Sequence, residues 1–147
     1  MADIARNRQA SYKYNFLEKW EAGLMLQGSE VKSLRNGGVQ LKDAFATVSN
    51  GEVWLHNMHI APYAPASREN HDPERSRKLL LHRGEIERLI GRTSEKGLTL
   101  IPTRLYWKNG RAKIEIALAR GKNVQDKRRY LKEKDARREI QQALQER

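Results

Sequence analysis

The sequence predicts a mainly β domain with inserted helices, followed by a basic C-terminal tail. Before residue 120, apolar and polar residues alternate with the period of β-strands, and two short patches have a helical period. Asn-Gly pairs at residues 50–51 and 109–110 stand between such strands, and this dipeptide suits the positive φ angles of a type I′ hairpin turn. After residue 120 the composition changes to strong helix formers with many charges.

The first strand is predicted over residues 12–26. Tyr12, Tyr14 and Phe16 alternate with polar residues, which is the pattern of a half-buried strand. Gly23 lies inside this run, and a glycine within a strand indicates either a bulge or the close approach of another backbone.

A short helix is predicted next, over residues 28–36. Ser29 is the predicted N-cap, and Gly37-Gly38 end the helix. The first hairpin then joins strands 44–48 and 53–58 through the first Asn-Gly turn, a combination that is typical of an antiparallel pair.

A long loop, residues 62–77, follows the hairpin and has neither a helical nor a strand period. Loops of this length in compact domains are usually functional or mobile. The second helix is predicted over residues 82–94, and Gly97 ends the segment. Its apolar face consists of Ile86, Leu89 and Ile90. The second hairpin joins strands 98–108 and 111–118.

Five or six antiparallel strands with two inserted helices in about 120 residues fit a small closed antiparallel barrel of the OB-like class, which often binds oligonucleotides. An open α+β sheet fits the same pattern of elements. We predict the OB-like domain over residues 1–120 and the basic tail over residues 121–147.

Charge indicates the kind of partner. Lys and Arg number 29 against 18 Asp and Glu, a net charge of +11, which favours nucleic acid first and an anionic membrane surface second. Residues 120–147 hold ten Lys and Arg and five Asp and Glu, a net charge of +5. A solvated charged end would explain this tail, but the total charge favours an arm that becomes helical on RNA, with Asp126 capping a helix from Lys127.

Composition excludes several classes of protein. There is no cysteine, which excludes disulfide scaffolds, thiolate zinc sites and cysteine nucleophiles. No run approaches the ~20 apolar residues of a membrane-spanning helix, and residues 1–11 contain no signal-peptide core. We therefore expect a cytoplasmic protein without a membrane partner.

The sequence does not support catalysis or metal binding. His56 and His59 are predicted three residues apart on one strand, which directs them to opposite faces and prevents a shared metal. His71 in the long loop could be a ligand, but exposed loop polarity is the favoured interpretation. The chain has no phosphate-binding glycine loop or nucleophile elbow, so we expect no enzymatic activity and no cofactor.

Basic and apolar residues are interleaved at two places. Residues 75–83 place cations beside three leucines, which fits either a groove for phosphate and base or a junction with core leucines and solvated cations. Tyr106 and Trp107 are neighbours on one predicted strand, so alternation buries one and leaves the other available as a stacking platform.

A set of short blocks runs in order across nearly the whole chain. The blocks are Glu21-Ala22-Gly23-Leu24, residues 27–35, Ile60-Ala61-Pro62-Tyr63, Asp72-Pro73, Arg77-Lys78-Leu79-Leu80-Leu81, Tyr106-Trp107-Lys108-Asn109, residues 118–122 and Asp126-Lys127-Arg128. In these blocks the sequence resembles the SsrA-binding protein family, small protein B.

The resemblance implies an OB-like barrel that binds the tRNA-like part of transfer-messenger RNA (tmRNA, or SsrA RNA). The family delivers alanylated tmRNA to ribosomes stalled on messages without a usable stop codon, and a degradation tag is then encoded on the nascent peptide in trans-translation. The tail is expected as a helix in the empty mRNA channel of the small subunit, beside 16S rRNA. Elongation factor Tu is an indirect partner on alanyl-tmRNA, and a monomer is expected.

The same resemblance assigns roles to ten residues. Four in the domain are expected to bind RNA: Asn7, Glu21, Lys78 and Leu80. Six in the tail are expected at the decoding centre and in the mRNA channel: Gly121, Lys122, Gln125, Asp126, Lys127 and Arg128. Relatives often have His or Tyr at the position of Gln125, where the ring stacks on an rRNA base, whereas glutamine can hydrogen-bond but stacks poorly.

The sequence thus predicts a non-enzymatic RNA-binding adaptor in ribosome rescue. The alternative within RNA binding is a general OB-like ribosomal or assembly protein. An RNA-processing enzyme is the alternative from another class, and it would need clustered carboxylates or paired histidines.

Overall fold

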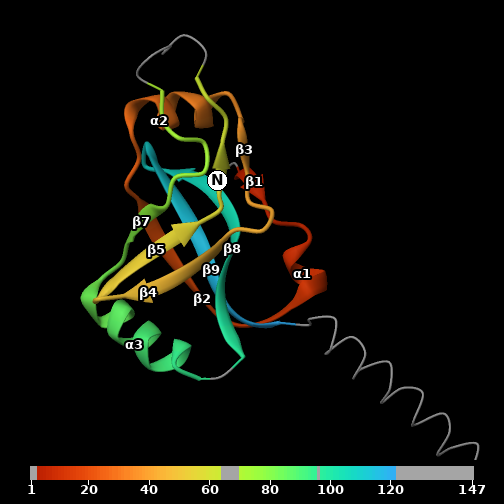
Figure 1. The fold of residues 1–147 in the computed structure, drawn as a ribbon, viewed down its shortest axis with the longest axis vertical. Coiled ribbons are helices and arrows are strands. Elements are labelled where there is room, and N and C mark those ends of the chain that lie inside the picture. The colour runs from red at the N-terminus through yellow and green to blue at the C-terminus, as the bar shows by residue number, and fades with distance from the viewer. Residues whose placement is uncertain (1–2, 64–69, 96, 122–147) are drawn as a thin grey trace, which may run out of the picture.

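The structure is a computed structural model that describes residues 3–63, 70–95 and 97–121 of the 147-residue chain. These residues form a mainly β fold with few helices, as predicted (Figure 1). In chain order the elements are β1 (Asp3–Arg6), α1 (Ala10–Lys13), β2 (Tyr14–Leu24), α2 (Gly28–Arg35), β3 (Val39–Gln40), β4 (Phe45–Ser49), β5 (Glu52–His56), β6 (His59–Ile60), β7 (Arg77–Leu80), α3 (Arg83–Thr93), β8 (Leu98–Lys108) and β9 (Arg111–Gly121).

The strands form one large antiparallel sheet that returns on itself. Strands β8, β4, β5, β7, β2 and β9 pair in that order, and β9 also pairs with β8, so that the pairings form a ring. Strand β1 pairs with β8, while β3 and β6 form a separate short pair. Figure 1 shows α2 and α3 at opposite ends of the sheet and α1 at its side.

Alternation along the strands builds the core inside this ring. On β5 it buries Val53 and Leu55, and on β9 it buries Ile114, Ile116 and Leu118, all of them 0% exposed. A smaller cluster packs α1 against the sheet and contains Ala10, Ile101 and Ala119. In the described part of the chain, none of the helices has the length and apolar content needed to cross a membrane.

The first predicted strand starts later than expected. Tyr12 lies in α1 and is 76% exposed, because the chain makes one helical turn before β2 starts at Tyr14. A bulge in β2 falls at Leu17, since the register with β9 shifts between Phe16 and Glu18. The alternating pattern could not reveal this turn, because a four-residue helix is too short to show its own period.

Helix α2 begins and ends within one residue of its prediction, but its N-cap is Gln27, so the prediction of Ser29 as the cap is wrong. The Gln27 backbone N–H bonds to a Glu30 carboxylate oxygen at 2.8 Å, as in a capping box. Ser29 is buried inside the helix and its hydroxyl lies 2.8 Å from His71 Nδ1. The Ser29 side chain therefore binds the loop instead of the helix end.

Both hairpins are confirmed, and their turns have the predicted backbone. The φ angles are 52° and 75° at Asn50 and Gly51, and again 52° and 75° at Asn109 and Gly110. The bounds of β8 agree with the prediction, those of β4 and β5 differ from it by one or two residues, and β9 begins as predicted but extends three residues further, to Gly121.

Helix α3 is confirmed, but only part of its predicted apolar face is covered. Leu89 is fully buried, Ile86 is partly buried against the core, and Ile90 is 46% exposed. Four short strands were not predicted with bounds of their own: β1, β3, β6 and β7. Each has only two to four residues, too few to show an alternating pattern.

A buried ion pair joins α2 to β7. The side chains of Arg77 and Glu30 are both 0% exposed and are hydrogen-bonded to each other. Arg77 also donates to the backbone oxygens of Met58 at 2.6 Å and Pro73 at 3.1 Å. Arg75 adds a second cation to the Glu30 carboxylate. One guanidinium thus links β7 to α2 and to the chain at Met58, which are distant in the sequence, and to the nearby Pro73.

These bonds also set the protonation of the acid. Burial alone would raise the pKa of Glu30, but hydrogen bonds from Arg75, the Gln27 backbone and Arg77 outweigh burial and lower it below 4.5. A carboxyl with a lowered pKa stabilises the fold fully above its ordinary pKa, and that contribution is lost as the pH falls through the lowered value. The pair is therefore fully charged at neutral pH.

We expect Arg77→Met to lower the free energy of unfolding by about 3–5 kcal/mol, because Glu30 would keep a buried charge without its fully buried partner. The measurement is urea unfolding at pH 7 followed by circular dichroism. Arg83→Met is the control, since Arg83 is 94% exposed and lies 3.7 Å from Glu87; we expect a change below about 0.5 kcal/mol. Equal effects of the two substitutions would contradict a special role for the buried pair.

Candidate nucleic-acid interface

A cleft of about 570 Å³ lies between the end of β2, β7 and the turn that joins β8 to β9. Its apolar wall includes Leu24, Leu80 and Trp107, and its charged wall includes Glu21, Arg111 and Lys113. An apolar wall beside cations suits a nucleotide, because the base can pack on the apolar side chains while the phosphate contacts the cations.

The floor of the cleft depends on Gly23, for which the prediction left a bulge or a close approach open. A close approach is present, but side chains rather than another backbone make it: a Cβ added at Gly23 would lie 3.3 Å from Leu80 Cβ and 3.7 Å from Lys113 Nζ. Gly23 and Leu80 are register partners of β2 and β7. Leu80 therefore lies across the bare backbone of β2 and remains 49% exposed.

Glu21 is held by neighbouring side chains at the edge of the cleft. The Tyr106 hydroxyl donates to one carboxylate oxygen, and Lys108 Nζ lies 3.2 Å from the other. The hydrogen bond from Tyr106 first, and then Lys108 and the charge of Lys113, lower the pKa of Glu21. Glu21 is thus an anion whose oxygens already have protein partners.

The neighbouring aromatic residues divide as alternation predicts. Tyr106 is 2% exposed, and burial followed by its bond to Glu21 raises the pKa of its hydroxyl. The Arg104 guanidinium lies over its ring, 4.4 Å from the centroid. Trp107 is partly exposed and lines the cleft while also packing against the core. Of the two rings, Trp107 is the one that a ligand in the cleft can touch.

Lys78 and Leu80 alternate along β7 with the buried Arg77 and Leu79, so both face outward. The Lys78 Nζ is 3.1 Å from Glu52 Oε1, and the two side chains are 35% and 44% exposed. The structure therefore places Lys78 on the same outward face as Leu80, next to the cleft but outside its lining.

Asn7 lies elsewhere. Its side-chain amide donates to the backbone oxygens of Pro102 at 3.0 Å and Leu41 at 3.4 Å. It lines two other hollows, one of which also contains the cations of Arg8 and Lys19. Glu21 and Leu80 are brought together by the fold, whereas Asn7 does not line their cleft.

The basic and apolar segment 75–83 fits neither of its two interpretations alone. Leu79 is a core residue, as a junction would require, but Arg77 is buried rather than solvated. Leu80 is exposed in the cleft, as a binding groove would require. The buried arginine could not be predicted, because its acid partner Glu30 lies 47 residues away in sequence.

The histidines correct two expectations. His71 is 5% exposed, so its interpretation as exposed loop polarity is wrong; its ring bonds to Ser29 and to the Ile60 carbonyl at 2.8 Å. His56 and His59 lie on two different strands, β5 and β6, rather than on one. Among the residues that the structure describes, no three His, Cys, Asp or Glu side chains are grouped to hold a metal.

Of the six expected tail residues, only Gly121 lies within the described residues. It ends β9 as the register partner of Tyr14, and the Tyr14 ring lies 3.6 Å from where a Cβ would stand. The other five, Lys122, Gln125, Asp126, Lys127 and Arg128, lie outside them, as does the expected helix N-cap at Asp126.

Sequence reasoning missed three cations beside the cleft. They are Lys108, Arg111 and Lys113, which flank the second Asn-Gly turn. Their spacing around that turn was a usable signal, because alternation directs Arg111 and Lys113 to one face of β9. The spacing could not show that β7 lies beside the same cleft.

Comparison with known proteins gives consistent matches. A family model described as SmpB protein matches residues 4–146. The chain is 57% identical to the SsrA-binding protein of Carboxydothermus hydrogenoformans over 141 residues, which cover 96% of this chain and 95% of that protein. It is 58% identical to the SsrA-binding protein of Geobacillus thermodenitrificans, with 98% and 93% covered.

A solved structure described as "tmRNA-SmpB: a journey to the center of the bacterial ribosome" contains a similar chain. The TM-score is 0.70 and the sequence identity 48%, with 84% of this chain and 87% of that chain covered. Matches of this extent, in sequence and in fold, show that the chain belongs to the SmpB protein family.

Proposed function

We propose that this protein binds tmRNA and acts in trans-translation, delivering alanylated tmRNA to stalled ribosomes for rescue and peptide tagging. The observation that carries the proposal is the similarity to SsrA-binding proteins, at 57% and 58% identity over nearly the whole chain. The charge of +11 fits a polyanionic partner. In this role the protein is a cytoplasmic adaptor without catalytic activity of its own.

The cleft is the proposed RNA contact of the domain. Arg111 and Lys113 would meet phosphates, while Leu80 and Trp107 would pack against a base or ribose. Lys78 extends the same outward face. The proposed role of Asn7 is to position the N-terminal segment, since its amide is bonded to two backbone carbonyls.

The proposed architecture is an OB-like barrel over residues 1–120 with a basic tail over residues 121–147. The ring of strand pairings supports a closed barrel. On the ribosome the tail would be a helix in the empty mRNA channel, with Lys127 and Arg128 against phosphates of 16S rRNA at the decoding centre. The protein would act as a monomer, and elongation factor Tu would join it indirectly through alanyl-tmRNA.

The RNA that accompanies the protein from its own cells tests this function. We expect one dominant structured RNA with a tRNA-like end, identified by sequencing what co-purifies at low salt. A heterogeneous pool would indicate a general RNA-binding or assembly protein instead. Turnover of added RNA by the purified protein would indicate an RNA-processing enzyme.

We expect Glu21→Ala to weaken tmRNA binding roughly tenfold, although it removes a negative charge, because Lys108 and Tyr106 lose the group that holds them. Mobility shift and circular dichroism measure binding and fold. Glu87→Ala, 69% exposed on α3, removes the same charge elsewhere and should not weaken binding. If Glu21 acts through Lys108, the losses in Glu21→Ala and Lys108→Ala are not additive in the double variant. Additive losses would instead favour direct contact of Glu21 with a base amino group.

We expect a chain that stops after Lys122 to fold and to bind tmRNA, because it keeps β9 and the Tyr14–Gly121 pair. It should fail to support tagging, since Asp126, Lys127 and Arg128 would be missing. A reconstituted tagging assay beside an RNA-binding assay measures both. The full-length Lys127→Ala/Arg128→Ala double variant is the matched control and should show the same separation. Tagging by the truncated chain at the full rate would mean that the tail is only a solvated end.

A further inference from the structure

The outward face of β7 and β5 carries an apolar patch beyond the cleft. Trp54 is the register partner of Lys78, and the Met25 backbone N–H donates to the Lys78 carbonyl at 3.1 Å. Met25, Lys78 and Trp54 therefore form one row across neighbouring strands. Leu80 lies two residues further along β7 on the same face. We name Met25, Trp54, Lys78 and Leu80 together the Trp54 patch.

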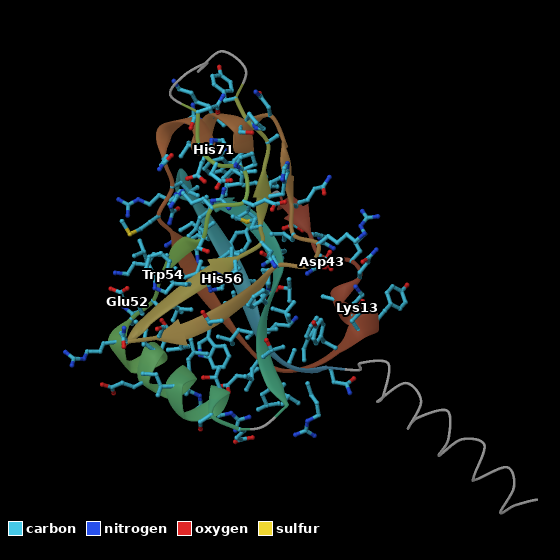
Figure 2. All side chains as sticks on the ribbon, in the orientation of Figure 1. Lys13, Asp43, Glu52, Trp54, His56 and His71 are labelled. Atoms are coloured by element: carbon cyan, nitrogen blue, oxygen red, sulfur yellow. The ribbon has the colours of Figure 1, made fainter. Side chains whose placement is uncertain are left out.

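The side chains of the patch are not used by the core. Met25 and Leu80 are 51% and 49% exposed. Along β5, Glu52, Trp54 and His56 alternate with buried residues and so share the outward face (Figure 2). Trp54 is partly exposed and belongs to neither apolar cluster of the described residues, whereas Trp20 is buried in the core and Trp107 packs against it.

Lys78 gives the patch a cation at its centre. Its only ion pair among the described residues is with Glu52 at 3.1 Å, and both side chains are substantially exposed. Exposed pairs of this kind are worth little, because water screens them. A phosphate, which offers several acceptor oxygens, can therefore replace Glu52 as the partner of Lys78 at small cost.

We propose that the Trp54 patch binds an unpaired nucleotide of RNA, whose base stacks on the Trp54 indole while a neighbouring phosphate contacts Lys78. The inference rests on the proposed RNA-binding function and adds a second contact to it. Stacking on an exposed aromatic ring tolerates any base, since every base has a π-face. Met25 extends the apolar surface on the side of Lys78 away from Trp54, and Leu80 extends it along β7.

Continuity with the cleft favours RNA over a protein as the occupant. Leu80 belongs to both surfaces, so a strand bound in the cleft can continue onto the patch at Leu80. Leu80 lies between two groups of cations, with Arg111 and Lys113 on one side and Lys78 on the other. A row of cations with apolar side chains between them suits a phosphate backbone with splayed bases.

Affinity for tmRNA provides the first test. We expect Trp54→Ala to weaken binding roughly 5- to 100-fold, while Trp54→Phe, which keeps an aromatic ring, loses much less. Trp54→Leu keeps apolar bulk without a stacking face and should resemble Trp54→Ala. Tyr12→Ala, which removes a 76% exposed ring on α1, is the control and should bind as the unaltered protein does. Circular dichroism confirms that each variant is folded.

Salt dependence separates stacking from charge. Trp54→Ala should leave the slope of log affinity against log salt unchanged, whereas Lys78→Gln should reduce it by about 0.7, the value for one phosphate of a single strand. Glu52→Gln frees Lys78 and should tighten binding more than Glu95→Gln, which removes the same charge from an exposed site after α3. Equal effects of these two Glu variants would contradict a phosphate at Lys78.

Fluorescence provides a readout that needs no tmRNA. A single-stranded adenine RNA hexamer should quench the tryptophan emission of the full chain, and Trp54→Phe should lose a component that Trp107→Phe retains. If the hexamer quenches through Trp54 but tmRNA is not bound, the proposed function is wrong, while nucleotide binding at the Trp54 patch is supported. Binding of tmRNA with unchanged affinity in Trp54→Ala and Trp54→Leu would show that the Trp54 patch does not contact the RNA. If those variants also failed in tagging, the occupant would be a protein, and the nucleotide proposal would be wrong.

Discussion

The Arg77 guanidinium, carried by β7, bonds to α2, to the chain after β5 and to the loop at Pro73. A buried guanidinium must have all its donors matched, because an unmatched charge in the interior is costly. This requirement fixes the start of β7 against α2 and the β5–β6 connection. The exposed part of β7, where Lys78 and Leu80 lie, follows directly from that anchor.

The binding surfaces follow from how β7 meets β2. A glycine at position 23 lets Leu80 lie this close without displacement, since a Cβ there would be 3.3 Å from Leu80 Cβ and Leu80 would have to shift slightly. The approach exposes Leu80 and brings it beside Lys113. Glu21, held by Tyr106 and Lys108, gives the same region a fixed anion among cationic side chains. Packing and electrostatics therefore cooperate in one small region.

Local patterns predicted most of the fold and little of the site. Asn-Gly turns and alternation are local signals, and both hairpins were found from them. Tyr12 was misplaced because one helical turn leaves no periodic trace. His71 was expected as exposed loop polarity, and Arg77 as a cation either in a phosphate groove or in solvent, since their partners Ser29, Ile60 and Glu30 are not local in sequence. Glu21 and Leu80 were named by family resemblance, but their meeting in one cleft depends on a pairing that no local pattern encodes.

Strand β9 is paired along most of its length on both sides, with β2 on one side and β8 on the other. Its last residue, Gly121, is still in register with Tyr14. A pull on the chain beyond Gly121, directed along the strand, would load the hydrogen bonds of both ladders in shear and together, rather than opening them one at a time.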